Sequence, residues 1–288
     1  MKKHIRLIIR KLLHANQAET ISDALDRYRV KIEKLMYDKK YSLSDFRKAL
    51  ISVGLQEGDI VMVHASWRRF YNFLGTPEDI IALIKEIIGP EGTLLMPSYG
   101  QSREYFDILH TPSNAGVLSE IFRNQVGVER SACTHFSIAG IGPHAPILFK
   151  DAFHSKYGFD EYSPYYKLHQ FANTKILYLG LGSAPNKVSM VHCAAYRLSG
   201  EFSPFKNLLS RHYTGTLIID GKKYKKSMIM RANGCKNNKK VFQKIASLVQ
   251  KQKRMKLSNL DLVLMEANDL FNQAITYILQ GHNCYLGL

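Results

Sequence analysis

Cysteine is scarce in this chain of 288 residues, which holds four scattered cysteines and no CxxC pair. This spacing excludes a zinc ribbon and a disulfide framework, so we expect reduced thiols, no metal site and a cytoplasmic protein. Long apolar stretches are absent too, because no run approaches the roughly 18 residues that span a bilayer. Residues 1–14 begin like a signal peptide, but basic residues interrupt the apolar part and no small-residue cleavage site follows.

Acidic residues are also few, with 24 Asp and Glu against 40 Lys and Arg, which gives a formal net charge of +16. Such a charge favours anionic partners, and it does not choose among nucleic acid, an anionic membrane and a phosphate-rich ligand. The imbalance is strongest over residues 206–254, where 14 basic residues accompany a single acid, Asp220.

Several enzyme signatures are missing: the chain has no Walker sequence, no GxGxxG, no GxSxG and no HExxH. P-loop, dinucleotide-binding, serine-elbow and zinc-protease classes therefore have no motif to support them. What is present is an ordinary globular composition, 45% hydrophobic and 22% charged, in a chain long enough for a sizeable core.

The chain divides into an N-terminal helical extension, residues 1–41, and one α/β domain, residues 42–288. Helix-like periodicity and mixed charge in the extension favour a pair of helices packed on the main body. A basic amphipathic membrane contact through residues 1–14 is the alternative.

Strand and helix patterns alternate along the main domain. Strand, helix and strand follow one another between residues 60 and 97, which predicts a right-handed βαβ crossover. We expect a mixed, largely parallel sheet with helices on both faces. The expected elements are helices over 44–53 (capped by Ser44-Asp45), 76–88, 117–122 and 259–279, strands over 60–63, 92–97, 137–142 and 176–182, and a hairpin over 216–230 that turns at Asp220-Gly221.

Polar residues follow the first of these strands, from His64 to Arg69. Turn N–H groups with nearby arginines can hold a pyrophosphate, although a histidine at the core edge and solvated arginines would give the same pattern. Trp67, the one tryptophan, can stack on a ligand ring or simply pack. In a second polar cluster, residues 131–137, the hydroxyls can bind phosphate or cap loop backbone.

His192 follows the strand over 176–182, a short loop and the start of a helix, an arrangement that sets an imidazole at the rim of a sheet. A structural histidine on the inner face of a helix is the alternative. Cys193 adjoins it, but neighbouring helical residues point about 100° apart, so we do not expect these two side chains to bond.

Taken together, these segments resemble the aminoglycoside 3-N-acetyltransferase family, also called the antibiotic N-acetyltransferase family, over roughly residues 42–280. The family's Gly-Pro-Glu-Gly-Thr-Leu-x-Met-Pro-Thr resembles residues 89–98, the most specific match, and its His-Ser-Ser-Leu after a strand resembles residues 64–67. Its Phe-Asp…Thr-Pro-Ser-x-x-Gly and Ser-Pro-Tyr-Tyr-Lys-Leu segments resemble residues 107–116 and 159–168. Its Leu-Gly-Val-Gly…Asn-Thr-x-x-His-x-Ala-Glu-Tyr resembles residues 179–182 and 189–196.

The resemblance implies an acetyl-CoA-dependent N-acetyltransferase in which His192 is the general base for the acceptor amine. His64 would lie nearby. Glu161 and Asp160 are candidates to orient an imidazole, and solvated loop acids are the alternative for both. Turn N–H groups near Ser66 and Ser137 would contact the cofactor pyrophosphate. The residues that we assign to cofactor binding are Ser66, Trp67, Arg68, Ser113 and Ser137.

The departures from the family pattern concern the acceptor. The pattern's glutamate in His-x-Ala-Glu is Ala195 here, so polycationic aminoglycosides should be poorer substrates. Its His-Pro-x-His-Ser is residues 133–137 here, with the histidine displaced to His135. We therefore expect an amino-sugar acceptor, either nucleotide-linked or a surface-glycan precursor, and a homodimer is compatible with this function.

Two alternatives stay open. One is a basic non-enzymatic module on the same fold that binds RNA or anionic membrane, although nucleic acid is not the expected partner. The other is an aminoglycoside 3-N-acetyltransferase or another acyl-CoA transferase.

Overall fold

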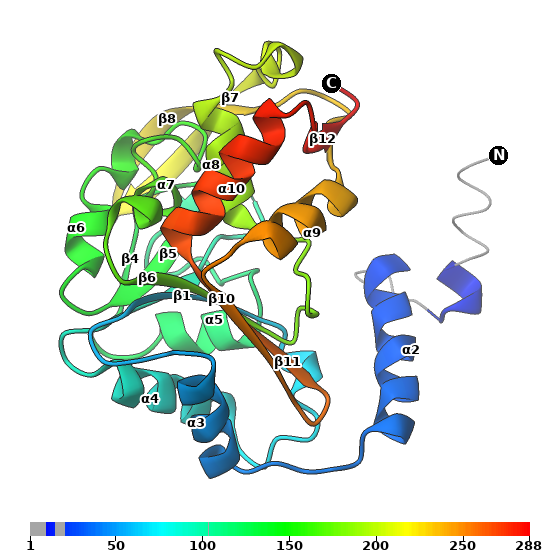
Figure 1. Ribbon diagram of the computed structural model, residues 1–288. Coiled ribbons are helices and arrows are strands. Elements are labelled where there is room, and N and C mark those ends of the chain that lie inside the picture. The colour runs from blue at the N-terminus through cyan, green and yellow to red at the C-terminus, as the bar shows by residue number, and fades with distance from the viewer. Residues whose placement is uncertain (1–9, 15–20, 103) are drawn as a thin grey trace.

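A seven-stranded mixed sheet forms the centre of the computed structural model, which describes residues 10–14, 21–102 and 104–288 (Figure 1). The strand order is β10-β11-β6-β1-β2-β5-β4. The strands are β1 (Ile60–Ala65), β2 (Thr93–Pro97), β4 (Glu129–Arg130), β5 (Ile138–Ile141), β6 (Thr174–Leu179), β10 (Gln252–Leu257) and β11 (Leu260–Glu266).

Parallel pairing is confined to the middle of this sheet. β1 pairs in parallel with β2 and with β6, whereas the other neighbouring pairs are antiparallel. The α/β class and the mixed sheet are confirmed, but the expectation of a largely parallel sheet is wrong. At one edge the reason is local, because Ser258 and Asn259 join β10 directly to β11, and so short a turn permits only antiparallel pairing.

Helices cover both faces of the sheet, as expected (Figure 1). On β1, Ile60 and Met62 belong to one core cluster and Val61 and Val63 to the other, so the continuous apolar run is buried on both sides. The helices are α2 (Ile21–Met36), α3 (Leu43–Ser52), α4 (Pro77–Ile88), α5 (Val117–Arg123), α6 (Ala145–Phe149), α7 (Pro164–Lys167), α8 (Ser189–Arg197), α9 (Lys239–Leu248) and α10 (Ala267–Leu279).

The helix starts follow their caps. α4 begins after Thr76, whose side chain accepts a hydrogen bond from the Asp79 N–H while the Asp79 carboxylate accepts from the Thr76 N–H. α3 has the same capping box, but its cap is Ser42 with Asp45, two residues before the expected Ser44. The expected cap was misplaced because Ser44 and Ser42 offer the same hydroxyl, and only Ser42 stands three residues before an acid that can close the box.

The C-terminal part contains one error of the sequence interpretation. Residues 259–279, expected as one helix, form β11 followed by α10. Leu260, Leu262 and Leu264 enter one core cluster while Val263 and Met265 enter the other. This alternation with a period of two is a strand pattern, and it ends where α10 begins.

Two smaller sheets accompany the central one. β7 (Leu209–Ile219) and β8 (Lys222–Arg231) form the expected hairpin, and Asp220 and Gly221 at its turn have φ angles of 48° and 75°. β3 (Tyr105–Asp107) pairs in parallel with β7. Near the C-terminus, β12 (Tyr285–Leu286) pairs with β9 (Lys236–Asn237).

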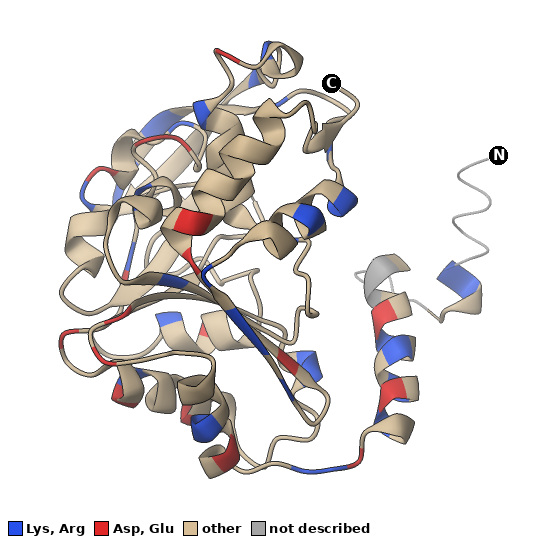
Figure 2. Ribbon diagram, in the orientation of Figure 1, with Lys and Arg blue, Asp and Glu red and all other residues tan. Residues whose placement is uncertain are grey.

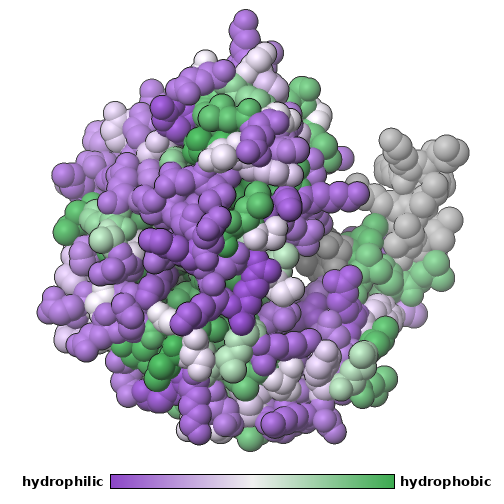
Figure 3. Space-filling model, in the orientation of Figure 1, coloured by the Kyte–Doolittle hydropathy of each residue, from purple (hydrophilic) through white to green (hydrophobic). Residues whose placement is uncertain are grey.

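α2 stands beside the main body, and charges of both signs alternate along it (Figure 2). Its Asp26 and Glu33 form ion pairs with Arg69. Hydrophobic surface shows on this part of the molecule in Figure 3, and the exposed apolar side chains of α2 are Leu25, Ile32, Leu35 and Met36. Residues 1–9 and 15–20 lie outside the described residues, and with them most of the expected membrane contact. The boundary at residue 41 stays a prediction. No helix in the described ranges is long and apolar enough to cross a membrane.

Candidate active site

His192 lies in the first turns of α8, which follows β6 and a loop, as the sequence predicts. Its Nδ1 lies 2.6 Å from the Tyr285 hydroxyl. The rings of Phe159 and Phe242 lie 4.8 and 5.2 Å from the imidazole, centroid to centroid. The His192 side chain is 9% exposed. It is therefore largely buried among aromatic rings, with the Tyr285 hydroxyl as its hydrogen-bond partner.

This environment sets the charge of His192. Burial lowers its pKa well below the ordinary value of 6.5, and the nearby Arg231 guanidinium lowers it further. The imidazole is therefore neutral near pH 7. Within the described part of the chain, Nε2 makes no hydrogen bond, and it can take a proton when the proton of the neutral ring is on Nδ1.

Cys193 does not join this chemistry. The thiol is buried, and desolvation raises its pKa well above the ordinary value. A protonated thiol is a poor nucleophile, which agrees with the expectation that Cys193 and His192 do not act as a pair.

Two acids were expected to orient an imidazole, and the structure places both elsewhere. Glu161 accepts a hydrogen bond from the Tyr196 hydroxyl. The Asp160 carboxylate accepts from the N–H groups of Lys156 and Tyr157, at 2.7 and 2.8 Å, and so closes a turn. The imidazole partner is Tyr285, which sequence reasoning missed because no local signal links residues 93 positions apart.

His64 lies at the carboxyl end of β1. Its ring stacks on Tyr178 of β6, with centroids 5.3 Å apart and planes 13° from parallel. Burial lowers the pKa of His64 to about 4. The structure thus contains a second neutral imidazole, held by stacking.

The stretch after His64 is already engaged within the protein. The Ser66 N–H donates to the Leu179 carbonyl at 3.0 Å. Trp67 stacks on Phe70, with ring centroids 5.2 Å apart. Arg68 lies 3.4 Å from the Asp26 carboxylate and is 44% exposed at the side chain.

Ser137 and His135 occupy the second polar cluster. The Ser137 hydroxyl is fully buried and donates to the Ser131 carbonyl at 2.8 Å, while the Ser137 carbonyl accepts from the Ser98 N–H at 2.7 Å. His135 Nε2 lies 2.7 Å from the Tyr213 hydroxyl. This cluster joins the end of β2 to the start of β5, and the cofactor roles of Ser66 and Ser137 stay predictions.

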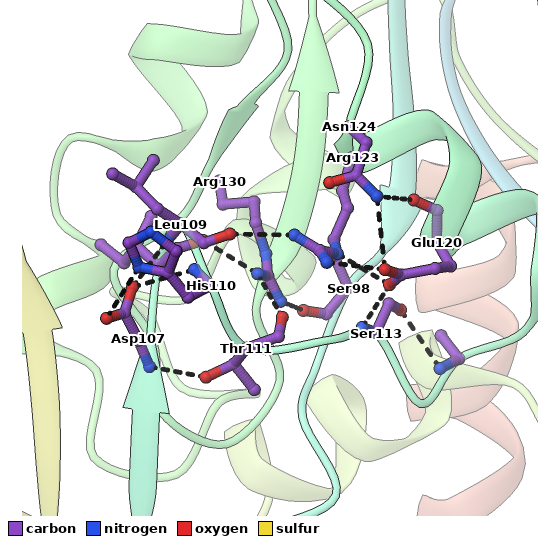
Figure 4. A network of polar contacts seen from close by, with 12 residues as sticks. Ser98, Asp107, Leu109, His110, Thr111, Ser113, Glu120, Arg123, Asn124 and Arg130 are labelled. Carbon is purple, nitrogen blue, oxygen red and sulfur yellow. Dashed lines mark hydrogen bonds and ion pairs between the residues drawn. The ribbon is translucent and has the colours of Figure 1, made fainter.

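Ser113 lines a cavity of about 390 Å³, together with Gln101, Ser102, Tyr105, Asp107, His110, Thr111, Pro112 and Asn114. The polar contacts behind this loop are drawn in Figure 4. The Ser113 N–H donates to Glu120, whose carboxylate also holds Arg123. His192 is not among the residues that line this cavity.

Arg130 holds the loop over residues 108–114 by hydrogen bonds to its backbone carbonyls. Its guanidinium donates to the carbonyls of Ile108 and Thr111, at 2.8 and 2.7 Å, and to that of Ser98 (Figure 4). Burial lowers the pKa of Arg130 to about 10, so it stays charged at neutral pH. Sequence reasoning missed Arg130, and its place directly before the polar cluster at 131–137 was the one available signal.

The family model for aminoglycoside 3-N-acetyltransferase matches residues 62–278. The chain belongs to this family. Aminoglycoside N(3)-acetyltransferase IV from Salmonella is 32% identical over 154 residues, which are 49% of this chain and 56% of that protein. Aminoglycoside N(3)-acetyltransferase III from Pseudomonas aeruginosa is 25% identical, over 80% of this chain and 90% of that protein.

Solved structures support the fold of this aminoglycoside 3-N-acetyltransferase family member. AAC-IIIb, solved as a binary complex with CoASH, gives a TM-score of 0.70 at 20% identity and covers 85% of this chain and 98% of that one. The AAC(3)-IVa apoenzyme gives 0.67 at 23% identity, with 84% and 89% covered. The predicted resemblance is confirmed, and the family is one of acetyl-CoA-dependent acyltransferases.

Proposed function

We propose that this protein is an N-acetyltransferase that transfers the acetyl group of acetyl-CoA to an amino sugar, with His192 as the general base. The observation that carries the proposal is a neutral imidazole anchored at Nδ1 and free of hydrogen bonds at Nε2 within the described residues. It stands on the helix whose sequence matches the family's histidine motif. A neutral histidine is the protonation state that a base needs before it reacts.

The reaction uses few groups of the protein. The acceptor nitrogen attacks the thioester carbonyl, and Nε2 of His192 takes a proton from that nitrogen. The carbon–sulfur bond then breaks, the coenzyme A thiolate leaves and is protonated, and the new amide remains on the sugar. General base catalysis of this kind contributes about 10²- to 10⁴-fold in rate.

The acceptor that we propose carries fewer positive charges than an aminoglycoside and is nucleotide-linked or a surface-glycan precursor. The net charge of +16 disfavours polycations. Arg231 adds positive charge close to His192. Ala195, where the family pattern has glutamate, is fully buried, so that position offers no carboxylate to the acceptor. The names of the relatives favour aminoglycosides instead, which makes these the comparison substrates.

Release of the coenzyme A thiol tests the proposal, with purified protein, acetyl-CoA and a panel of amino sugars, nucleotide amino sugars and aminoglycosides. We expect thiol release with a neutral or anionic amino sugar and less with the aminoglycosides. His192→Asn should abolish it, and His212→Asn, at an exposed histidine on β7, is the matched control. No release with any acceptor, or equal turnover in both variants, contradicts the proposal.

The exposed lysines of the β7–β8 hairpin favour a second candidate, a non-enzymatic module that binds a polyanion. A ligand that binds only the native state raises the melting temperature. Acetyl-CoA should therefore stabilise the acetyltransferase at moderate salt. A module of the second kind would respond to RNA or anionic vesicles instead, and this response would fall steeply with salt.

A further inference from the structure

Tyr285 is the polar partner of His192 and comes from the C-terminal strand β12. The two rings are nearly parallel, 11° apart, and the hydroxyl is 2.6 Å from Nδ1. Tyr285 is 1% exposed. This contact therefore fixes both the orientation of the imidazole and the nitrogen that faces the protein interior.

The group that donates this hydrogen bond, either the Tyr285 O–H or Nδ1–H, decides whether Nε2 of His192 can accept a proton. If the tyrosine donates to Nδ1, the neutral ring carries its proton on Nε2 and cannot accept another there. If Nδ1–H donates to the tyrosine oxygen, Nε2 is a free acceptor. Only the second arrangement serves a base that acts through Nε2.

Tyr157 makes the second arrangement possible. Its buried hydroxyl makes no hydrogen bond of ordinary length among the described side chains, but the Tyr285 hydroxyl acts to lower the Tyr157 pKa, as a hydrogen-bond donor does. Since a phenol oxygen can accept a hydrogen bond, Tyr157 can accept the Tyr285 O–H and leave the Tyr285 oxygen for Nδ1–H. Arg231 lies over the Tyr285 ring, 4.9 Å from its centroid, and its charge lowers the pKa of His192.

The fold places Tyr285 through several contacts. β12 pairs with β9, so that Tyr285 lies opposite Asn237. Asn237 accepts a hydrogen bond from Arg231 at 2.6 Å, and the Tyr285 N–H donates to the Asn283 side chain at 2.8 Å. The tyrosine is therefore held at its backbone, at its ring and at its hydroxyl.

Tyr285 lies beyond the residues matched by the family model, which end at 278. Ala195 stands one helical turn after His192, and this chain has a methyl group there where the family pattern has a carboxylate. The hydroxyl from β12 thus gives the imidazole the polar partner that its own helix lacks.

We propose that Tyr285 is a positioning residue that holds His192 with its proton on Nδ1, so that Nε2 accepts the proton of the acceptor amine. The catalytic half of this inference rests on the proposed function, whereas the tautomer of His192 does not.

Tyr285→Phe removes only the hydroxyl. With the acceptor that releases the most thiol, we expect kcat to fall about 10- to 100-fold and the KM for acetyl-CoA to stay within about twofold. Tyr41→Phe is the matched control, since Tyr41 also buries a hydroxyl without a close partner among the described residues, next to Phe73 and away from α8. Its kcat should stay at the wild-type value.

Nitrogen NMR of ¹⁵N-histidine-labelled protein provides a readout that needs no activity, with the His192 signals assigned by their loss in His192→Asn. We expect the Nδ1–H form in the wild type, and a loss of that form in Tyr285→Phe but not in Tyr41→Phe. An Nε2–H form in the wild type, or unchanged kcat and tautomer in Tyr285→Phe, overturns the inference. Absence of acetyl transfer together with the expected tautomer change refutes the proposed function and leaves the positioning role standing.

Discussion

His64 and His192 are two desolvated imidazoles of one domain, and the protein holds them differently. His64, at the carboxyl end of β1, is held by stacking on Tyr178. His192 has apolar rings around it and also a hydrogen bond between Nδ1 and the Tyr285 hydroxyl. Burial lowers the pKa of both rings and keeps them neutral. The contrast teaches that desolvation sets the charge of a histidine, whereas a directional partner decides which nitrogen reacts.

The most direct test of this difference between His64 and His192 is to replace each histidine by asparagine. We expect His192→Asn to lower kcat by about 10²-fold or more, because a base is lost. His64→Asn should lower it by less than about tenfold, since its ring has no fixed hydrogen-bond direction. Steady-state thiol release measures both effects. A larger loss of kcat in His64→Asn than in His192→Asn would identify His64 as the general base instead.

A second test concerns the loop that carries Ser113, which Arg130 supports. Arg130→Met removes the donors to three loop carbonyls and should cost about 3 kcal/mol of unfolding free energy. Arg47→Met, which breaks an exposed pair with Glu86, should cost less than about 1 kcal/mol. Urea unfolding measures the two. Equal losses would show that Arg130 does not hold the loop.

The pH dependence of the free energy of unfolding tests whether both histidines are neutral in the folded protein. Because both histidines have a folded-state pKa below 6.5, the unfolded chain binds more protons than the folded one in mild acid. The free energy of unfolding should be greatest above about pH 6.5 and fall as the pH drops toward 4. Urea unfolding between pH 7.5 and pH 4.5 measures this, and His64→Asn and His192→Asn should each flatten the slope. Parallel slopes in all three proteins would contradict the assignment of the neutral rings.

The smallest expected effect lies at the contact of α2 with Arg68 and Arg69. Asp26→Asn should lower the free energy of unfolding by no more than about 1 kcal/mol, because this ion pair is partly exposed. Asp26→Asn also frees the Arg68 side chain from its ion pair with Asp26. If Arg68 contacts the cofactor, as predicted, the loss of this pair should lower the KM for acetyl-CoA roughly twofold at low salt. Glu86→Gln is the control on a remote pair, and an unchanged KM in Asp26→Asn argues against a cofactor role for Arg68.

The sequence predicted those parts of the fold whose signals are local. β1 and α4 were found because a doubly buried apolar run and a capping box each lie within a few residues. β11 was missed because its alternating apolar residues run directly into the apolar residues of α10, with no turn residues between them. Read together, the two stretches were taken for one long helix.

The site divides in the same way. His192 was found from a motif, but Tyr285 lies 93 residues away and reaches it only through the pairing of β9 with β12. Arg130 likewise binds carbonyls 19 to 32 residues earlier in the chain. Glu161 was a reasonable choice by charge, yet its carboxylate accepts a hydrogen bond from Tyr196 of α8. Partners of this kind depend on tertiary geometry that no spacing rule encodes.

The pairing of β3 with β7 has a mechanical consequence. Tyr105 and Asp107 line the cavity near Ser113, and the same strand is bonded to the basic hairpin through Thr216 and Ile218. Backbone pairing thus connects the cavity wall to the β7–β8 hairpin within one sheet. Loosening the hairpin should therefore raise the exchange rates of the β3 amides, which hydrogen exchange measures.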